Sequence, residues 1–121
     1  MTTKLIKLIP VIPSEDIARD TAWYEKHAGF RTFYADKMYA VIYREQLVLH
    51  LQWHSDTDDD PLLGGSVVRF HVKNIQPIFD EFVARGTVKP DALKLGTAWD
   101  TNEFGFYDLN RNAIVVMEDV E

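Results

Sequence analysis

The first half of the chain alternates between apolar patterns of period two and apolar patterns of helical period. "KLIKLIPVI" predicts a strand over residues 4–12. A helix is predicted over residues 13–29, because Ser14 is a good N-cap and Gly29 stands where a helix commonly ends. Three further strands are expected over residues 30–35, 39–44 and 47–53.

The second half repeats this order after the polar, acidic stretch "HSDTDDDPLLGG". A strand over residues 66–72 precedes a helix over 74–86, for which Asn74 is the expected N-cap. This helix carries an apolar stripe at the spacing of one buried face, formed by Ile75, Ile78, Phe79 and Phe82. Three weaker strands are expected over residues 92–98, 103–108 and 113–118.

Two copies of a βαβββ unit predict an α+β fold. We expect two curved sheets with the helices on their convex face and a cavity on the concave face. The chain is too short for two independent cores, so residues 1–121 form a single domain. Within it, repeat one covers about 1–55, a linker 56–65 and repeat two 66–121.

Composition narrows the classes of function. The net charge of −6 and the lack of a basic stripe argue against nucleic-acid binding. No apolar run approaches the ~20 residues of a membrane span. The absence of cysteine and of a signal-peptide pattern fits a cytoplasmic protein. An acidic surface would favour cationic ligands at a cleft, although such a surface commonly serves only solubility.

Two segments, one near the start of the chain and one at its end, resemble the vicinal oxygen chelate superfamily, which includes glyoxalases, bleomycin resistance proteins and dioxygenases. They are "IPVIPSEDIARDTAWYEKHAGF" and "EFGFYDLNRNAIVVMED". The chain is most similar to the bleomycin resistance group, whose tryptophan loop is represented by "TAWDTNEF", with Trp99, Glu103 and Phe104. The resemblance covers nearly the whole chain. It implies a homodimer that exchanges its first strand, with Pro10 and Pro13 bracketing the hinge.

Metal-dependent members of this superfamily carry His, Gln or Glu at matching points on the first and last strand of each unit. By resemblance these positions are Ile9, Val48, Val67 and Val115, and none of these side chains can bind a metal ion. We therefore expect no metal and no cofactor. A displaced metal site formed by His50, His71 and a carboxylate such as Glu103 stays open as an alternative.

Strand alternation indicates which polar groups face the cavity. On residues 47–53 the leucines would pack on a helix, which leaves His50 and Gln52 on the other face. On residues 66–72, Arg69 and His71 would face the same space. These side chains are candidates for ligand binding, together with Glu103.

Two aromatic residues are candidates by resemblance. Tyr39 and Trp99 fall where bleomycin resistance proteins hold a flat heteroaromatic ligand at the dimer cleft, and such rings favour stacking on a cationic aromatic molecule. Alternatively, Trp99 packs across the dimer interface. In the run "DTDDD", Asp60 is a candidate rim residue, although charge runs are usually only solvated.

Two turns depart from the superfamily pattern. Arg111 and Asp100 occupy positions that are glycine in the family. Because an arginine adopts a left-handed conformation less readily than Asn110 or Asn112, we expect a different turn type at 108–112.

The resemblance implies a metal-free, non-catalytic protein that sequesters an aromatic, cationic small molecule, either bleomycin-like or an unidentified metabolite, at dimer clefts. Such a protein would confer antibiotic resistance. The alternative is a metal-dependent enzyme of the glyoxalase or dioxygenase type.

Overall fold

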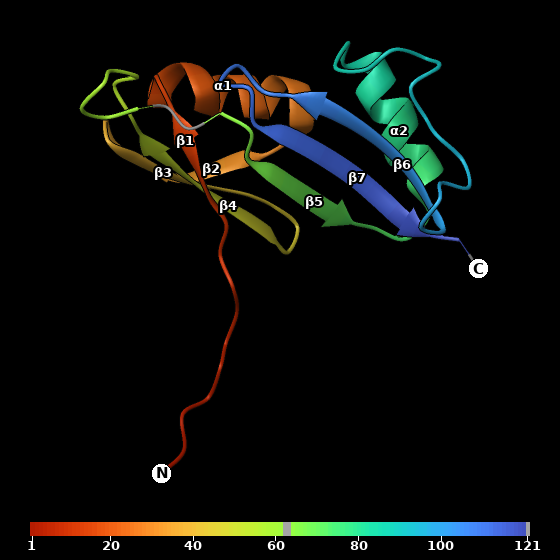
Figure 1. Cartoon of the computed structure of the whole chain (residues 1–121), viewed down its shortest axis with the longest axis horizontal. Helices are drawn as coiled ribbons and strands as arrows, with labels where there is room; N and C mark the ends of the chain where they lie inside the picture. Colours follow the sequence, from red (N-terminus) through yellow and green to blue (C-terminus); the bar gives the residue numbers. More distant parts are fainter. Residues whose placement is uncertain (62–63, 121) are drawn as a thin grey trace.

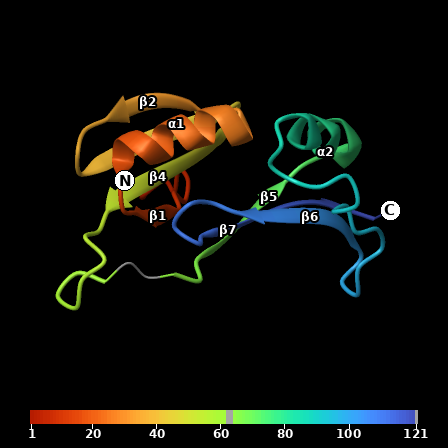
Figure 2. The same cartoon turned by 90° about the horizontal axis from the view of Figure 1, so that it is seen from above.

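A computed structural model describes residues 1–61 and 64–120, which form two small sheets with one helix on each (Figure 1). The elements are β1 (Val11–Ser14), α1 (Ile17–Ala28), β2 (Arg31–Ala35), β3 (Tyr39–Arg44), β4 (Leu47–Trp53), β5 (Val67–His71), α2 (Ile75–Ala84), β6 (Thr101–Tyr107) and β7 (Ala113–Asp119). Figure 2 shows the two halves side by side, each with its own helix. The predicted α+β architecture is confirmed.

The two sheets share one plan. The first has the strand order β1-β4-β3-β2 and the second the order β5-β7-β6. In each repeat the leading strand pairs in parallel with the last strand, β1 with β4 and β5 with β7. The remaining pairs within each sheet are antiparallel hairpins.

The strand expected over residues 92–98 does not form. This segment contributes only an isolated bridge between Lys94 and Glu103, and its backbone turns at Gly96, which has a φ of 61°. The Asn102 side chain accepts a hydrogen bond from the Gly96 N–H at 2.9 Å. Side-chain bonding to the backbone competes with strand pairing, so the segment is a loop rather than a fourth strand.

The first strand is shorter than expected. The prediction of a strand over residues 4–12 was wrong for this single chain, because β1 begins at Val11. The preceding arm, residues 1–9, leaves the body of the molecule (Figure 1), and Leu5 and Leu8 are 92% and 90% exposed. The Pro10 carbonyl still accepts a hydrogen bond from the His50 N–H, and this bond ends the pairing with β4.

The two helix caps differ from the prediction, α1 in the capping residue and α2 in the group that makes the capping bond. Asp16, not Ser14, caps α1, and its carboxylate accepts the Arg19 N–H at 3.0 Å. Asn74 is the N-cap of α2, as expected, but its side chain makes no capping bond. The Glu118 carboxylate on β7 accepts the Ile75 N–H instead, at 2.8 Å. Thus α1 is capped from its own sequence, whereas α2 is capped from its sheet.

The core lies between the helices and the sheet faces that they cover. Leu49 and Leu51 on β4 are buried, as are Phe70 on β5 and the α2 residues Phe79 and Phe82, so the inward faces predicted from alternation are confirmed. Aromatic contacts also join the repeats, where Phe30 packs on Phe70 and Trp23 on Phe106. We call the opposite, uncovered side of each sheet its outer face.

Candidate functional site

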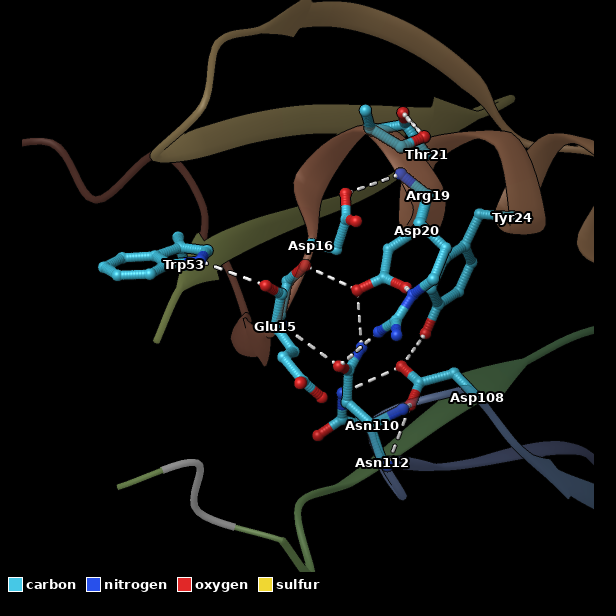
Figure 3. A network of polar contacts seen from close by, with 12 residues as sticks. Glu15, Asp16, Arg19, Asp20, Thr21, Tyr24, Trp53, Asp108, Asn110 and Asn112 are labelled. Carbon is cyan, nitrogen blue, oxygen red and sulfur yellow. Dashed lines mark hydrogen bonds and ion pairs between the residues drawn. The ribbon is translucent and has the colours of Figure 1, made fainter. Parts of the chain in front are cut away.

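A buried polar network joins α1 to the turn between β6 and β7 (Figure 3). The Asp20 carboxylate accepts hydrogen bonds from the Ser14 hydroxyl, the Arg19 guanidinium and the Asn110 amide. Asn110 in turn accepts the Glu15 N–H at 2.9 Å. These groups fix the turn of repeat two against the first helix of repeat one.

Asp108 is the second centre of this network. Its carboxylate accepts the Tyr24 hydroxyl at 2.7 Å, the Asn110 and Asn112 N–H groups, and the Asn112 side-chain amide. Burial, and then the neighbouring Asp108 charge, raise the pKa of Tyr24 well above its ordinary range, so Tyr24 stays protonated and donates. Asp108 is therefore a structural acid with its bonding capacity filled.

The turn at residues 108–112 has its left-handed residue at Arg111 rather than at Asn110 or Asn112. Arg111 itself adopts the left-handed conformation, with a φ of 63°, and the Arg111 N–H donates to the Asp108 carbonyl. Asp100 also has a positive φ, at 61°. Both residues hold a left-handed backbone that favours glycine, at a cost of ~1–2 kcal/mol per residue that neighbouring hydrogen bonds offset.

A second junction holds the other end of α1. Arg44 on β3 forms a two-pronged ion pair with Glu81 of α2, at 2.6 and 2.7 Å, and also donates to the Ala28 carbonyl. Arg85 bonds both Glu81 and the Lys26 carbonyl. Hydrogen bonding from Arg44, followed by that from Arg85, lowers the pKa of Glu81. The last carbonyls of α1 thus receive donors from both repeats.

The outer face of repeat two gathers four of the eight candidate ligand-binding residues. Arg69 on β5 donates to Glu103 on β6 at 2.9 Å, and the Trp99 indole N–H donates to the same carboxylate at 3.2 Å. His71 lies next to Asp119, with 3.1 Å between Nε2 and Oδ2. Glu103 is only 9% exposed, whereas Trp99 is 63% exposed. The arrangement presents an open indole on a buried carboxylate.

A hollow of about 410 Å³ lies on this face. Its lining is formed by Arg69, Trp99, Thr101, Met117 and Asp119. Thr101, Met117 and Asp119 were not expected as site residues. The alternation of β7 could have identified Met117 and Asp119, since Ile114 and Val116 face the core and the intervening positions face outward.

The outer face of repeat one carries three more candidate ligand-binding residues, Tyr39, His50 and Gln52. Tyr39 on β3 and His50 on β4 are joined through the hydroxyl and Nδ1 at 2.7 Å, and their rings meet edge to face. Gln52 is the register partner of Tyr39. Tyr43 lies on the same face of β3 as Tyr39, and the alternation of "YAVIYR" could have identified it.

Asp60 lies in the linker and folds that loop onto itself. Its carboxylate accepts the Ser55 N–H at 2.9 Å and contacts His54 Nδ1 at 2.8 Å. These bonds lower the pKa of Asp60. Its carboxylate is thus engaged within the linker, where it orders residues 54–60.

The displaced metal trio does not come together in this chain. Among residues 1–61 and 64–120, no three His, Cys, Asp or Glu side chains lie where they could share a metal ion. The acids of the last hairpin have other partners: Glu103 pairs with Arg69, Asp108 holds its turn, and Glu118 caps α2. Over the same residues, no helix is long and apolar enough to cross a membrane.

Comparison with known proteins supports the resemblance seen in the motifs. No protein-family model matches the chain. A bleomycin resistance protein from Geobacillus stearothermophilus is 21% identical over 131 residues, covering 97% of this chain and 99% of its own length. A bleomycin-binding protein complexed with bleomycin has a TM-score of 0.80 at 18% identity, covering 95% of this chain and 99% of its own. A glyoxalase/bleomycin resistance protein/dioxygenase from Nocardioides has a TM-score of 0.77 at 13% identity, covering 100% and 87%.

Proposed function

From the vicinal oxygen chelate fold of this chain and its full-length similarity to bleomycin resistance proteins, we propose that the protein binds and sequesters a small aromatic, cationic molecule of the bleomycin type. The observation that carries this proposal is the open indole of Trp99, held on Glu103 beside the hollow on the outer face of repeat two. A fixed aromatic ring binds a flat ligand at a low entropic cost, because the ring is already ordered before binding.

The charge of the site supports a cationic ligand. Arg69 is neutralised by Glu103, so it adds little net positive charge to this face. Asp119 lines the hollow and leaves it with an acidic group. The whole chain carries a net charge of −6, which attracts cations over longer range at low ionic strength.

The same proposal includes a homodimer with clefts at its interface. Both outer faces are uncovered in one chain, and the arm of residues 1–9 exposes Leu5, Ile6 and Leu8. Large apolar side chains exposed together on one segment commonly mark an interaction surface. A second copy would receive the arm, as in the strand exchange expected from the sequence, and would close each outer face into a cleft.

Sedimentation velocity tests the dimer. The wild-type protein should sediment as a dimer at ~1 μM, which requires an interface worth more than roughly 8 kcal/mol. The double variant Leu5→Asp, Leu8→Asp should sediment as a monomer, because charged residues replace apolar contacts. Lys4→Glu, on the same arm, is the control and should leave the dimer intact. A wild-type monomer would contradict the dimer.

Calorimetric titration with metal-free bleomycin tests the ligand. We expect saturable binding with a Kd below about 1 μM, a binding free energy of roughly −8 kcal/mol. Metal analysis of tag-free protein belongs beside it, since a stoichiometric divalent ion would contradict metal-free binding. Absence of binding by the folded protein would overturn the bleomycin-type ligand.

A further inference from the structure

Gly105 lies on the outer face of β6 between Glu103 and Tyr107, and its backbone does not require glycine. Its φ is not among the positive values found at Gly29, Gly65, Gly86 and Gly96. Glycine within a strand costs roughly 0.5–1 kcal/mol relative to alanine and often marks a place where a ligand or another backbone approaches closely. The local backbone conformation therefore does not explain why residue 105 is a glycine.

The register places two small apolar side chains of β7 beside Gly105. Its partner on β7 is Val115, and Val115 is paired with Arg69 on β5. The next row along the sheet contains Tyr107, Ala113 and Val67. The floor at the middle of this outer face is thus formed by Gly105, Val115 and Ala113, none of which rises far above the sheet.

The walls around this floor are larger. Arg69 leans away from its own row, because its Nη1 contacts Glu103 Oε2 at 2.9 Å and Met117 Sδ at 3.7 Å. Tyr107 stands on the opposite side of Gly105 along β6 and is 72% exposed. A low apolar floor consequently separates the Tyr107 ring from the Arg69–Glu103 pair.

The spacing suits one aromatic ring. Alternate residues on a strand lie ~7 Å apart, so Glu103 and Tyr107 are separated by ~14 Å along β6 with Gly105 midway. Stacked aromatic rings have centroids 4.5–7 Å apart, so a ring standing over Gly105 lies within stacking reach of Tyr107. On its other side, the ring lies within reach of the Arg69 guanidinium.

We propose that Gly105 determines ligand specificity, because its missing side chain opens a slot between Tyr107 and the Arg69–Glu103 pair for one planar ring of the ligand. This inference rests on the proposed function and adds a second ring-binding position to Trp99. A Cβ at residue 105 would lie 3.3 Å from the Ile114 carbonyl oxygen and 3.6 Å from Val115 Cγ2, so alanine requires that carbonyl to move by a few tenths of an ångström.

Calorimetric titration of Gly105→Ala and Gly105→Val with metal-free bleomycin tests the slot. One added carbon in a fitted pocket is worth about 10–200-fold in affinity, so we expect at least tenfold weaker binding by Gly105→Ala and a larger loss in Gly105→Val. Ala35→Val, at an exposed strand position far along the chain, is the control and should bind as the wild type does. Thermal melts should place Gly105→Ala close to the wild type.

Three results would overturn the slot. Unchanged affinity in a folded Gly105→Val would mean that no ring stands over this residue. A change in subunit association without a change in affinity would assign this face to the dimer interface. Absence of bleomycin binding by the wild type would remove the proposed function itself, and the slot with it, whereas the first two results leave that function intact.

Discussion

The two repeats are alike where the helices cover them and differ in the segment that follows each helix. In repeat one, the chain after α1 forms β2, which pairs with β3 over its length apart from a bulge. In repeat two, the corresponding segment after α2 is a loop that touches β6 only at the bridge of Lys94 with Glu103. The loop carries Trp99 onto the outer face, where it meets Glu103.

This difference indicates that core packing and ligand binding fall on different parts of each repeat. The inward faces repeat because each must bury the same kind of apolar stripe. In repeat two, the segment at the sheet edge does not pair as a strand. The loop that it forms supplies Trp99, the aromatic candidate for binding. Function is then expected where the repeat is broken, since loops on a rigid scaffold are common positions for binding residues.

The largest effect is expected from breaking the junction that joins the repeats. Asp108→Ala removes acceptors from Tyr24, Asn110 and Asn112, all of them buried, and should lower the free energy of unfolding by ~3 kcal/mol. Urea denaturation measures this loss. Asp60→Ala is the matched control, because it removes an acid from an exposed loop and should cost far less. Equal costs would contradict the role of the junction.

The next largest loss of stability is expected from removing the helix caps, which differ between the two repeats. Asp16→Ala should destabilise α1 by about 1 kcal/mol, the usual cost of losing a capping side chain. Glu118→Ala should cost ~1–2 kcal/mol, because it removes both the cap of α2 and the bond from Asn102. Urea denaturation compares the variants, and a neutral Glu118→Ala would show that α2 needs no cap from its sheet.

Acid should weaken the second junction. Arg44 lowers the pKa of Glu81 below its ordinary value of 4.5, so the stabilisation is present above pH 4.5 and is lost as pH falls through the folded-state pKa. Denaturation midpoints measured between pH 7 and pH 3 should show this decline. In Glu81→Gln the decline should be shallower, and an unchanged pH profile in that variant would contradict the assignment.

The smallest effect is expected in the loop that replaces the fourth strand. Leu95→Ser alters an exposed side chain and should change stability by less than ~0.5 kcal/mol. Ile42→Ser, in the strand that β2 joins, is the contrast and should destabilise strongly because Ile42 is buried. A large effect of Leu95→Ser in urea denaturation would show that the loop is packed as tightly as a strand.

Periodicity predicted most of the fold because buried stripes recur at fixed spacing. It identified both helices and both last hairpins, and it assigned Leu49 and Leu51 to the core. It missed the loop at 92–98, because the hydrogen bond from the Gly96 N–H to the Asn102 side chain is a local contact that the apolar pattern does not predict. Likewise, the cap of α2 by Glu118 joins residues 43 positions apart.

The candidate site was less predictable for the same reason. Alternation placed Arg69 and His71 outward, but the pairing of Arg69 with Glu103 and of His71 with Asp119 depends on the register between strands. The pairing of Tyr39 with His50 also depends on register. Register is set by the whole sheet, so these partners are visible only in the folded chain.

A tryptophan fluorescence titration with metal-free bleomycin, on the wild type and on Trp99→Ala, tests the central claim most directly. Trp53→Phe is the control, because Trp53 donates to the Glu15 carbonyl at the opposite repeat. We predict saturable quenching in the wild type and the control, and its loss in Trp99→Ala. Equal quenching in Trp99→Ala, or none in the folded wild-type protein, would contradict ligand binding on the outer face of repeat two.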